Sequence, residues 1–164
     1  MIKRILSLLS VGCLLFAIGC SSTPKDDEAG LDGEGADITE QPLSFDPMGS
    51  DSGTIAGLNT VYFDYDSSNL GERAKQMLSE NIAWINSHPN VTIQVEGHTD
   101  SRGSNEYNLT LGERRANAVV TYMQGQGVDG SRLSVISYGE EKLQAVGDSD
   151  SDHAKNRRAN FVPR

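Results

Sequence analysis

Residues 91–127 read VTIQVEGHTDSRGSNEYNLTLGERRANAVVTYMQGQG, and they contain a strand pattern followed by a helix pattern. Apolar and polar side chains alternate over residues 91–96, which is typical of a strand with one buried face. From about Leu111 to Gln124 apolar side chains recur at helical spacing, and the glycines that follow indicate the end of the helix. The turn between the two patterns holds Asp100, so this acid is expected where a strand leads into a helix.

The flanking segments complete an α+β pattern. Residues 60–65 alternate as a strand does, and residues 71–87 place apolar side chains three or four apart, as a helix does. Two further strands are expected near residues 133–137 and 158–162. We therefore expect residues 59–164 to form one α+β domain in the order βαβαββ, a sandwich in which two helices pack on one face of a four-stranded mixed sheet.

Residues 1–19 have the composition of a signal peptide. Two basic residues precede an apolar run from Ile5 to Ile18, which is shorter than the roughly 20 residues of a membrane-spanning helix. The signal ends in AIGC (residues 17–20), which resembles a bacterial lipobox, and the serine that follows suggests delivery to the outer membrane. This resemblance implies cleavage before Cys20 and acylation of that residue. The alternative is an ordinary signal peptide with a chance cysteine.

The segment after the signal, residues 20–58, differs in composition from the rest of the chain. Residues 21–58 contain nine acidic residues, one basic residue and few large apolar side chains. Such a segment buries too little apolar surface to offset the entropy lost on ordering. We therefore expect a lipidated, acidic and disordered tether, which at full extension reaches about 130 Å.

The composition of the chain excludes several classes of function. With 14 Lys+Arg, 23 Asp+Glu and a formal net charge of −9, the protein lacks the basic surface that binds nucleic acid. Only one of the two cysteines, Cys20, would remain after cleavage, so neither a disulfide nor a thiolate metal site is expected. Residues 148–152, DSDSD, are interpreted as a solvated acidic loop rather than a calcium site. No metal and no cofactor are expected.

Five motifs follow one another in a specific order: GHTD (97–100), Tyr107-Asn108, LGERRA (111–116), SYGEEK (137–142) and NRR (156–158). Together they resemble the OmpA-like C-terminal domain family over residues 60–162, and the whole chain resembles the lipoproteins of Gram-negative envelopes that associate with peptidoglycan. The resemblance implies a module that binds peptidoglycan without chemistry, by clasping the diaminopimelate side chain of the stem peptide.

The chemistry of this ligand suits the residues of the motifs. The free end of diaminopimelate carries an ammonium and a carboxylate on one carbon, so its receptor needs an acidic and a basic side chain in one cleft. The resemblance implies that Asp100 and Arg115 are the two primary contacts. It places five further residues at or beside the cleft: Tyr65, Asp66, Asn108, Leu109 and Arg114.

Structural interpretations remain for some of these residues. Arg114 is also consistent with a solvated helix position, and Asn108 with a turn or cap position, which asparagine favours. Arg157 and Arg158 fit an ion pair at the start of a strand as well as a binding role. For Asp100 the corresponding interpretation is an ordinary loop acid.

The function implied by the resemblance is that of a non-enzymatic, lipid-anchored protein. It would link the outer membrane to the cell wall within the Tol–Pal system, with its domain in the periplasm and Tol-system periplasmic proteins as partners, and act in envelope integrity and cell division. One alternative is an OmpA-like lipoprotein subunit of a secretion or motility apparatus. Another is a wall-modifying enzyme that uses His98 and Asp100, although no nucleophile motif accompanies them.

Overall fold

Four strands form one mixed sheet in the order β1-β4-β2-β3. The computed structural model describes residues 49–164, so the predicted signal peptide, Cys20 and the predicted tether up to residue 48 lie outside the described residues. The elements are η1 (Ser50–Ser52), β1 (Val61–Tyr62), α1 (Glu72–Ser87), β2 (Ile93–His98), α2 (Asn105–Gly125), η2 (Gly130–Arg132), β3 (Leu133–Gly139), α3 (Asp150–Asn156) and β4 (Arg158–Pro163). The α+β class and the four-stranded mixed sheet expected from the sequence are confirmed.

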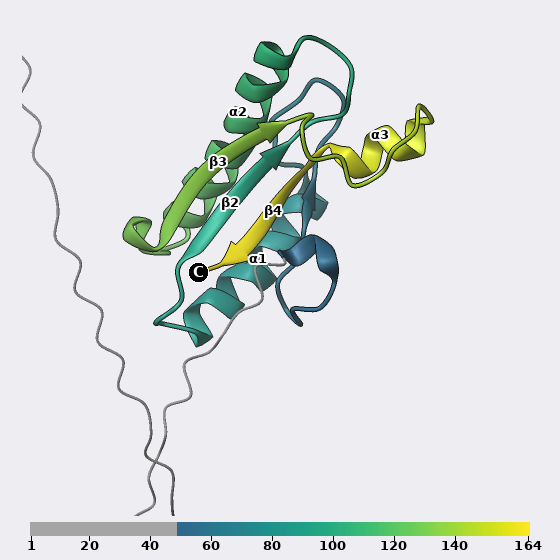
Figure 1. Ribbon diagram of the computed structural model, residues 1–164. Coiled ribbons are helices and arrows are strands. Elements are labelled where there is room, and N and C mark those ends of the chain that lie inside the picture. Colours follow the sequence, from purple (N-terminus) through teal and green to yellow (C-terminus); the bar gives the residue numbers. More distant parts are fainter. Residues whose placement is uncertain (1–48) are drawn as a thin grey trace, which may run out of the picture. The chain divides into compact units, whose positions relative to one another are not determined.

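The strand β2 lies in the interior of the sheet and has neighbours on both sides. It pairs in parallel with β3 and antiparallel with β4, while the short edge strand β1 pairs antiparallel with β4. Parallel neighbours require a long crossover connection, and α2 supplies it between β2 and β3. In Figure 1, β3, β2 and β4 run side by side, α2 covers one face of these strands, and α3 lies beyond one end of them.

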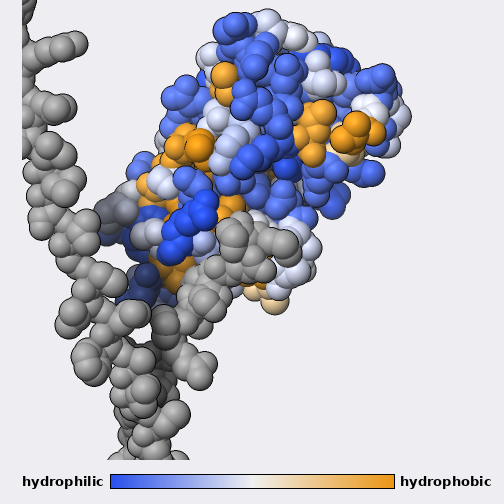
Figure 2. Space-filling view, in the orientation of Figure 1, coloured by the Kyte–Doolittle hydropathy of each residue, from blue (hydrophilic) through white to orange (hydrophobic). Residues whose placement is uncertain are grey.

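The apolar core lies between the sheet and the two long helices. Because side chains alternate along a strand, every second residue of β2 and β4 points to the helices. The fully buried core side chains include Val61, Leu78, Ile85, Ile93, Val95, Ala116, Val119, Met123, Ala159 and Phe161. On the face drawn in Figure 2, hydrophilic residues dominate and hydrophobic residues appear in separate small groups. None of the helices within residues 49–164 combines the length and hydrophobicity needed to cross a bilayer.

Two glycines allow α2 to approach the end of β2 very closely. An ideal Cβ atom on Gly97 would lie 1.9 Å from the carbonyl oxygen of Gly112, and one on Gly112 would lie 2.9 Å from the oxygen of Gly97. No side chain fits between these backbones. The contact brings the first turns of α2, and with them Arg115, against the strand end that leads to Asp100.

The opposite face of the sheet is polar and is covered by residues near the start of the described chain. Ser50 Oγ donates to Asn160 Oδ1 (2.8 Å), and Asp51 forms an ion pair with Arg158 (3.1 Å). Leu58 is also buried. The expected tether boundary at residue 58 therefore needs correction, because the described part of that segment packs on the sheet. The polar composition of the segment conceals this packing, which combines hydrogen bonds and an ion pair at Ser50 and Asp51 with burial of Leu58 in the apolar core.

Two helices differ from the expectation. The helix α2 begins at Asn105, about six residues earlier than expected, because Ser104 caps it by accepting a hydrogen bond from the Tyr107 backbone (3.3 Å). The expected acidic loop at residues 148–152 instead leads into α3. Ser149 and Asp152 form a capping box there, so the acids serve as helix-starting residues. The sandwich thus holds a third helix that hydrophobic periodicity did not reveal.

Candidate functional site

A cavity of about 210 Å³ opens at the end of the sheet where β2 leads into α2. It collects side chains from the segment after β1, the turn after β2, the first half of α2 and Arg157, the residue that precedes β4. The lining residues are Tyr65, Asp66, Thr99, Asp100, Arg102, Gly103, Tyr107, Asn108, Leu111, Arg115 and Arg157. Gly103 has a φ of 117°, which lets the turn reverse sharply before the helix begins.

Asp100 is the buried acid of this cavity. Its Oδ2 accepts hydrogen bonds from Arg102 Nη2 (2.6 Å) and Arg157 Nη1 (3.2 Å), and its Oδ1 accepts one from the Arg102 backbone (3.3 Å). Burial raises the pKa of Asp100, but the hydrogen bonds from Arg102 and Arg157 outweigh burial and hold that pKa below its ordinary value. The carboxylate is therefore ionised at neutral pH.

Arg115 is completely buried and joins three parts of the chain. Its Nε donates to the carbonyl of Ser67 (2.8 Å), its Nη1 to that of His98 (2.8 Å) and its Nη2 to that of Asp64 (3.1 Å). Burial, together with the nearby charge of Arg157, lowers the pKa of Arg115 to about 10. The group is still charged at neutral pH. Since a guanidinium has five N–H groups, two of those of Arg115 make no hydrogen bond to the protein.

Asp100 and Arg115 line the same cavity without pairing with each other. No ion pair joins them within residues 49–164, although both are charged. Opposite charges that share a cavity but are held apart can each engage one pole of a zwitterion. The arrangement is therefore suited to a small group that carries an ammonium and a carboxylate.

The rim of the cavity is aromatic and acidic. Tyr65 is 62% exposed, and the guanidinium of Arg102 lies 4.1 Å from the centre of its ring. The hydroxyl of Tyr107 donates to the carboxylate of Asp66. Asp66 has a φ of 51°, in the left-handed region that non-glycine residues rarely adopt. This backbone conformation turns the chain after Tyr65, so the segment after β1 closes one side of the cavity.

The structure brings together most, but not all, of the residues predicted for the site. Five of the seven line the cavity: Tyr65, Asp66, Asp100, Asn108 and Arg115. Leu109 does not line it, and its carbonyl accepts a hydrogen bond from Ser137 (2.7 Å). Arg114 does not line it either, and its guanidinium lies 5.7 Å from the Tyr107 ring centre.

Asn108 has a defined structural role in addition to its place in the cavity. It lies in the first turn of α2, and its Nδ2 contacts the Arg102 carbonyl (3.3 Å) and the Glu140 carboxylate (2.8 Å). It therefore ties the turn after β2 to the segment after β3. Asn108 is therefore neither the N-cap of the helix nor a residue of an isolated turn.

Two arginines of the cavity, Arg102 and Arg157, were not predicted as site residues. Arg157 pairs with Asp100, and Arg158 pairs with Asp51, so the ion-pair interpretation of these two residues describes what the structure shows. The position of Arg102, two residues after Asp100 in a turn, was the signal that a local pair was possible. The wall is completed by Thr99, Tyr107 and Leu111, which lie within the five motifs, and by Gly103, which lies between two of them.

We expect the buried His98 to make the stability of the domain depend on pH. Its side chain is 1% exposed, and the nearest acid is the Glu96 carboxylate at 3.7 Å. Burial lowers the pKa of His98 from its ordinary 6.5, and Arg158 adds to this, while Glu96 opposes it. As the pH falls below about 6.5, the unfolded chain takes up a proton at this position before the folded chain does, so the free energy of unfolding decreases.

Urea unfolding at pH 7.5 and pH 5.5 tests this expectation. The wild type should lose stability between the two values, and His98→Gln should lose clearly less. Glu96 and Asp100 have pKa values below their ordinary 4.5 and 3.8, so they titrate below this window. Equal losses in wild type and variant would show that His98 is not the titrating group.

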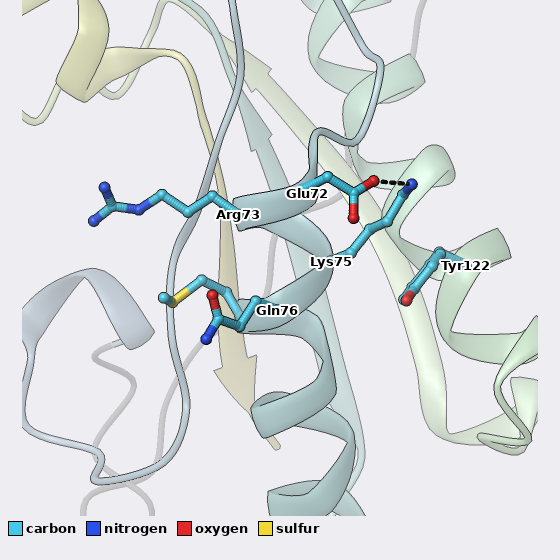
Figure 3. A pocket seen from close by; sticks show the side chains of 6 residues that line it. Glu72, Arg73, Lys75, Gln76 and Tyr122 are labelled. Carbon is cyan, nitrogen blue, oxygen red and sulfur yellow. Dashed lines mark hydrogen bonds and ion pairs between the residues drawn. The ribbon is translucent and has the colours of Figure 1, made fainter.

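A larger surface depression lies between α1 and α2, but its side chains do not form a comparable site. It has a volume of about 850 Å³ and is lined by Glu72, Arg73, Lys75, Gln76, Met77 and Tyr122. Figure 3 shows Lys75 joined to Glu72, at 2.8 Å, while Arg73 extends in another direction. The paired side chains of Lys75 and Glu72 are exposed, whereas Asp100 and Arg115 are buried charges that share one cavity, so we regard the smaller cavity around Asp100 as the candidate site.

Comparisons with known proteins point to one family. The chain matches the model of the OmpA family over residues 62–157. It is 38% identical over 161 residues to the peptidoglycan-associated lipoprotein of Haemophilus influenzae, with 96% of each chain covered. It is 42% identical over 132 residues to the peptidoglycan-associated lipoprotein of Agrobacterium fabrum, which covers 80% of this chain and 70% of that one.

Solved structures agree with this assignment. The crystal structure of the peptidoglycan-associated lipoprotein from Burkholderia pseudomallei has a TM-score of 0.62 at 38% identity, and the match covers 64% of this chain and 89% of that chain. The C-terminal domain of Helicobacter pylori MotB also reaches a TM-score of 0.62, at 24% identity over 66% of this chain and 85% of that chain, which shows a shared fold alone. The chain therefore belongs to the OmpA family and, within it, to the peptidoglycan-associated lipoproteins.

Proposed function

We propose that the domain binds peptidoglycan non-covalently by holding the free end of diaminopimelate in the cavity between Asp100 and Arg115. The observation that carries this proposal is the pair of opposite charges on one small cavity that do not pair with each other. The ligand ammonium approaches the Asp100 carboxylate. The ligand carboxylate approaches the free N–H groups of Arg115. No step of bond making or breaking is involved.

The whole protein then acts as a link between two layers of the envelope. Acylated Cys20 holds one end in the outer membrane, the domain holds the wall from the periplasmic side, and the acidic tether spans the distance between them. In this role the protein takes part in the Tol–Pal system through periplasmic Tol proteins and contributes to envelope integrity and cell division. The names of the relatives, all of which are peptidoglycan-associated lipoproteins, support the wall-binding part of this proposal.

A role in a secretion or motility apparatus is the competing proposal. The likeness to MotB concerns the fold alone and favours neither role. The two proposals differ in their partners: the Tol–Pal role requires binding of periplasmic Tol proteins by the purified chain. Pull-down of these proteins by the wild type, together with wall binding, supports the first proposal, whereas wall binding without any Tol contact supports the second.

Calorimetric titration with soluble muropeptides tests the wall-binding proposal. The chain from residue 20 onward, with Cys20→Ser to remove the acylation site, should bind diaminopimelate-type stem peptides and bind lysine-type stem peptides much more weakly. Asp100→Asn should weaken diaminopimelate binding about 10- to 100-fold, because it removes a charge-assisted hydrogen bond. Asp129→Asn makes the same charge change at the N-cap of η2, away from the cavity, and should leave binding unchanged.

Circular dichroism and urea unfolding must accompany these titrations, because Asp100 also pairs with two arginines. If the folded wild type binds neither kind of stem peptide, the proposed ligand is refuted. Equal binding by wild type and a folded Asp100→Asn variant would refute the assigned contact.

A further inference from the structure

Arg102 is the most exposed of the three arginines in the cavity. Its side chain is 38% exposed, against 15% for Arg157, while Arg115 is fully buried. It is held by one ion pair, to Asp100, and by the exposed ring of Tyr65. Arg157 is fixed in addition by the Phe63 carbonyl (3.1 Å), and Arg115 by three carbonyls. Only Arg102 can therefore leave Asp100 without breaking contacts that hold the fold.

The charges that line the cavity determine which ligands can displace the Arg102 side chain from Asp100. Three arginines face two aspartates, Asp66 and Asp100, and both side-chain bonds at Asp100 Oδ2 are already made by Arg102 and Arg157. A ligand with an ammonium alone meets an excess of positive charge and competes with Arg102 for the Asp100 carboxylate. The displaced guanidinium then has no new partner, which costs binding energy.

A ligand with an ammonium and a carboxylate on one carbon avoids this penalty. Its ammonium takes the place of Arg102 at Asp100, and its carboxylate lies within reach of the displaced guanidinium. One ion pair is then exchanged for two. The backbone of Arg102, which donates to Asp100 Oδ1 and whose carbonyl accepts from Asn108, stays in place during the exchange.

We propose that Arg102 is a specificity-determining residue, which exchanges the Asp100 carboxylate for the ligand carboxylate and so rejects ligands that carry an ammonium alone. This inference rests on the proposed function, because it takes diaminopimelate as the ligand. It assigns the discrimination between diaminopimelate and lysine stem peptides to an exposed side chain at the entrance rather than to the buried Arg115 alone.

The test uses three ligands and the chain from residue 20 onward with Cys20→Ser. The ligands are muropeptides with diaminopimelate, with diaminopimelate amidated at its free carboxylate, and with lysine. The wild type should prefer the first ligand over the other two. Arg102→Gln should bind diaminopimelate about tenfold more weakly and should bind the other two at least as tightly as the wild type, so the preference ratio falls at least tenfold.

Two further variants define the cause. Arg102→Lys keeps the charge and should retain most of the preference. Arg73→Gln removes one exposed positive charge from α1, outside the cavity, and should retain the full preference. These variants separate the exchange of ion partners from a general loss of positive charge.

The outcomes distinguish failure of this inference from failure of the proposed function. If the wild type does not bind diaminopimelate, both are refuted. If the wild type binds it and Asp100→Asn weakens binding, but Arg102→Gln keeps the wild-type preference among the three ligands, the inference alone is refuted. A uniform weakening of all three ligands by Arg102→Gln also refutes it, because a merely structural role would produce that pattern.

Discussion

Replacing Arg115 by alanine should abolish peptidoglycan binding and lower the free energy of unfolding by about 3–5 kcal/mol. The guanidinium is the partner of the carbonyls of Asp64, Ser67 and His98, and all three lose a charge-assisted hydrogen bond when it is removed. These carbonyls belong to the segment between β1 and α1 and to the end of β2. The variant should therefore loosen two walls of the cavity as well as remove a ligand contact.

Urea unfolding and muropeptide calorimetry measure the two effects separately. Arg115→Lys should recover part of the stability but little of the binding, because an ammonium lacks the planar fork that reaches three carbonyls and a ligand carboxylate. Arg73→Ala, which removes an exposed arginine from α1, serves as the matched control and should change neither quantity appreciably. A loss of binding by Arg115→Ala with stability within about 1 kcal/mol of the wild type would contradict the structural role.

The second large effect is expected for Gly97→Ala, at about 3 kcal/mol or more of lost stability. The added methyl group would lie 1.9 Å from the carbonyl oxygen of Gly112, so the start of α2 must move away from β2. This movement separates Arg115 from Asp100 and opens the core at Val95 and Ala116. Binding of diaminopimelate should fall even though no ligand contact has been replaced.

Gly125→Ala is the matched control for this substitution. Gly125 is the last residue of α2, and a Cβ atom there meets nothing within 4 Å. Since alanine favours the helix more than glycine, the control should be neutral or slightly stabilising. Chemical denaturation of both variants gives the comparison. A loss smaller than about 1 kcal/mol for Gly97→Ala would show that the helix and the strand are not in the tight contact described.

The regular elements could be predicted because they depend on local patterns. Residues 71–87 carry an apolar face at helical spacing, and the helix α1 indeed spans Glu72–Ser87. The alternation over residues 91–96 likewise anticipated β2, although the strand begins two residues later and continues to His98. The helix α3 was not predicted, because its residues form no apolar face. It depends on the capping box at Ser149, a polar feature that resembles a loop in composition.

The family, the order of the strands and long helices along the chain, and the place of Asp100 after a strand could be inferred from the sequence. The sequence pattern also put Arg115 near a helix start, whereas α2 begins ten residues earlier, at Asn105. Only the tertiary structure decided that Arg102 and Arg157 both pair with Asp100, and that Arg115 is buried among carbonyls. It also decided that Ser50 and Asp51 cover the polar face of the sheet. Charged side chains pair according to their distance and their burial in the folded protein. Asp100 and Arg157 are 57 positions apart in the sequence, so only the folding of the chain brings them together.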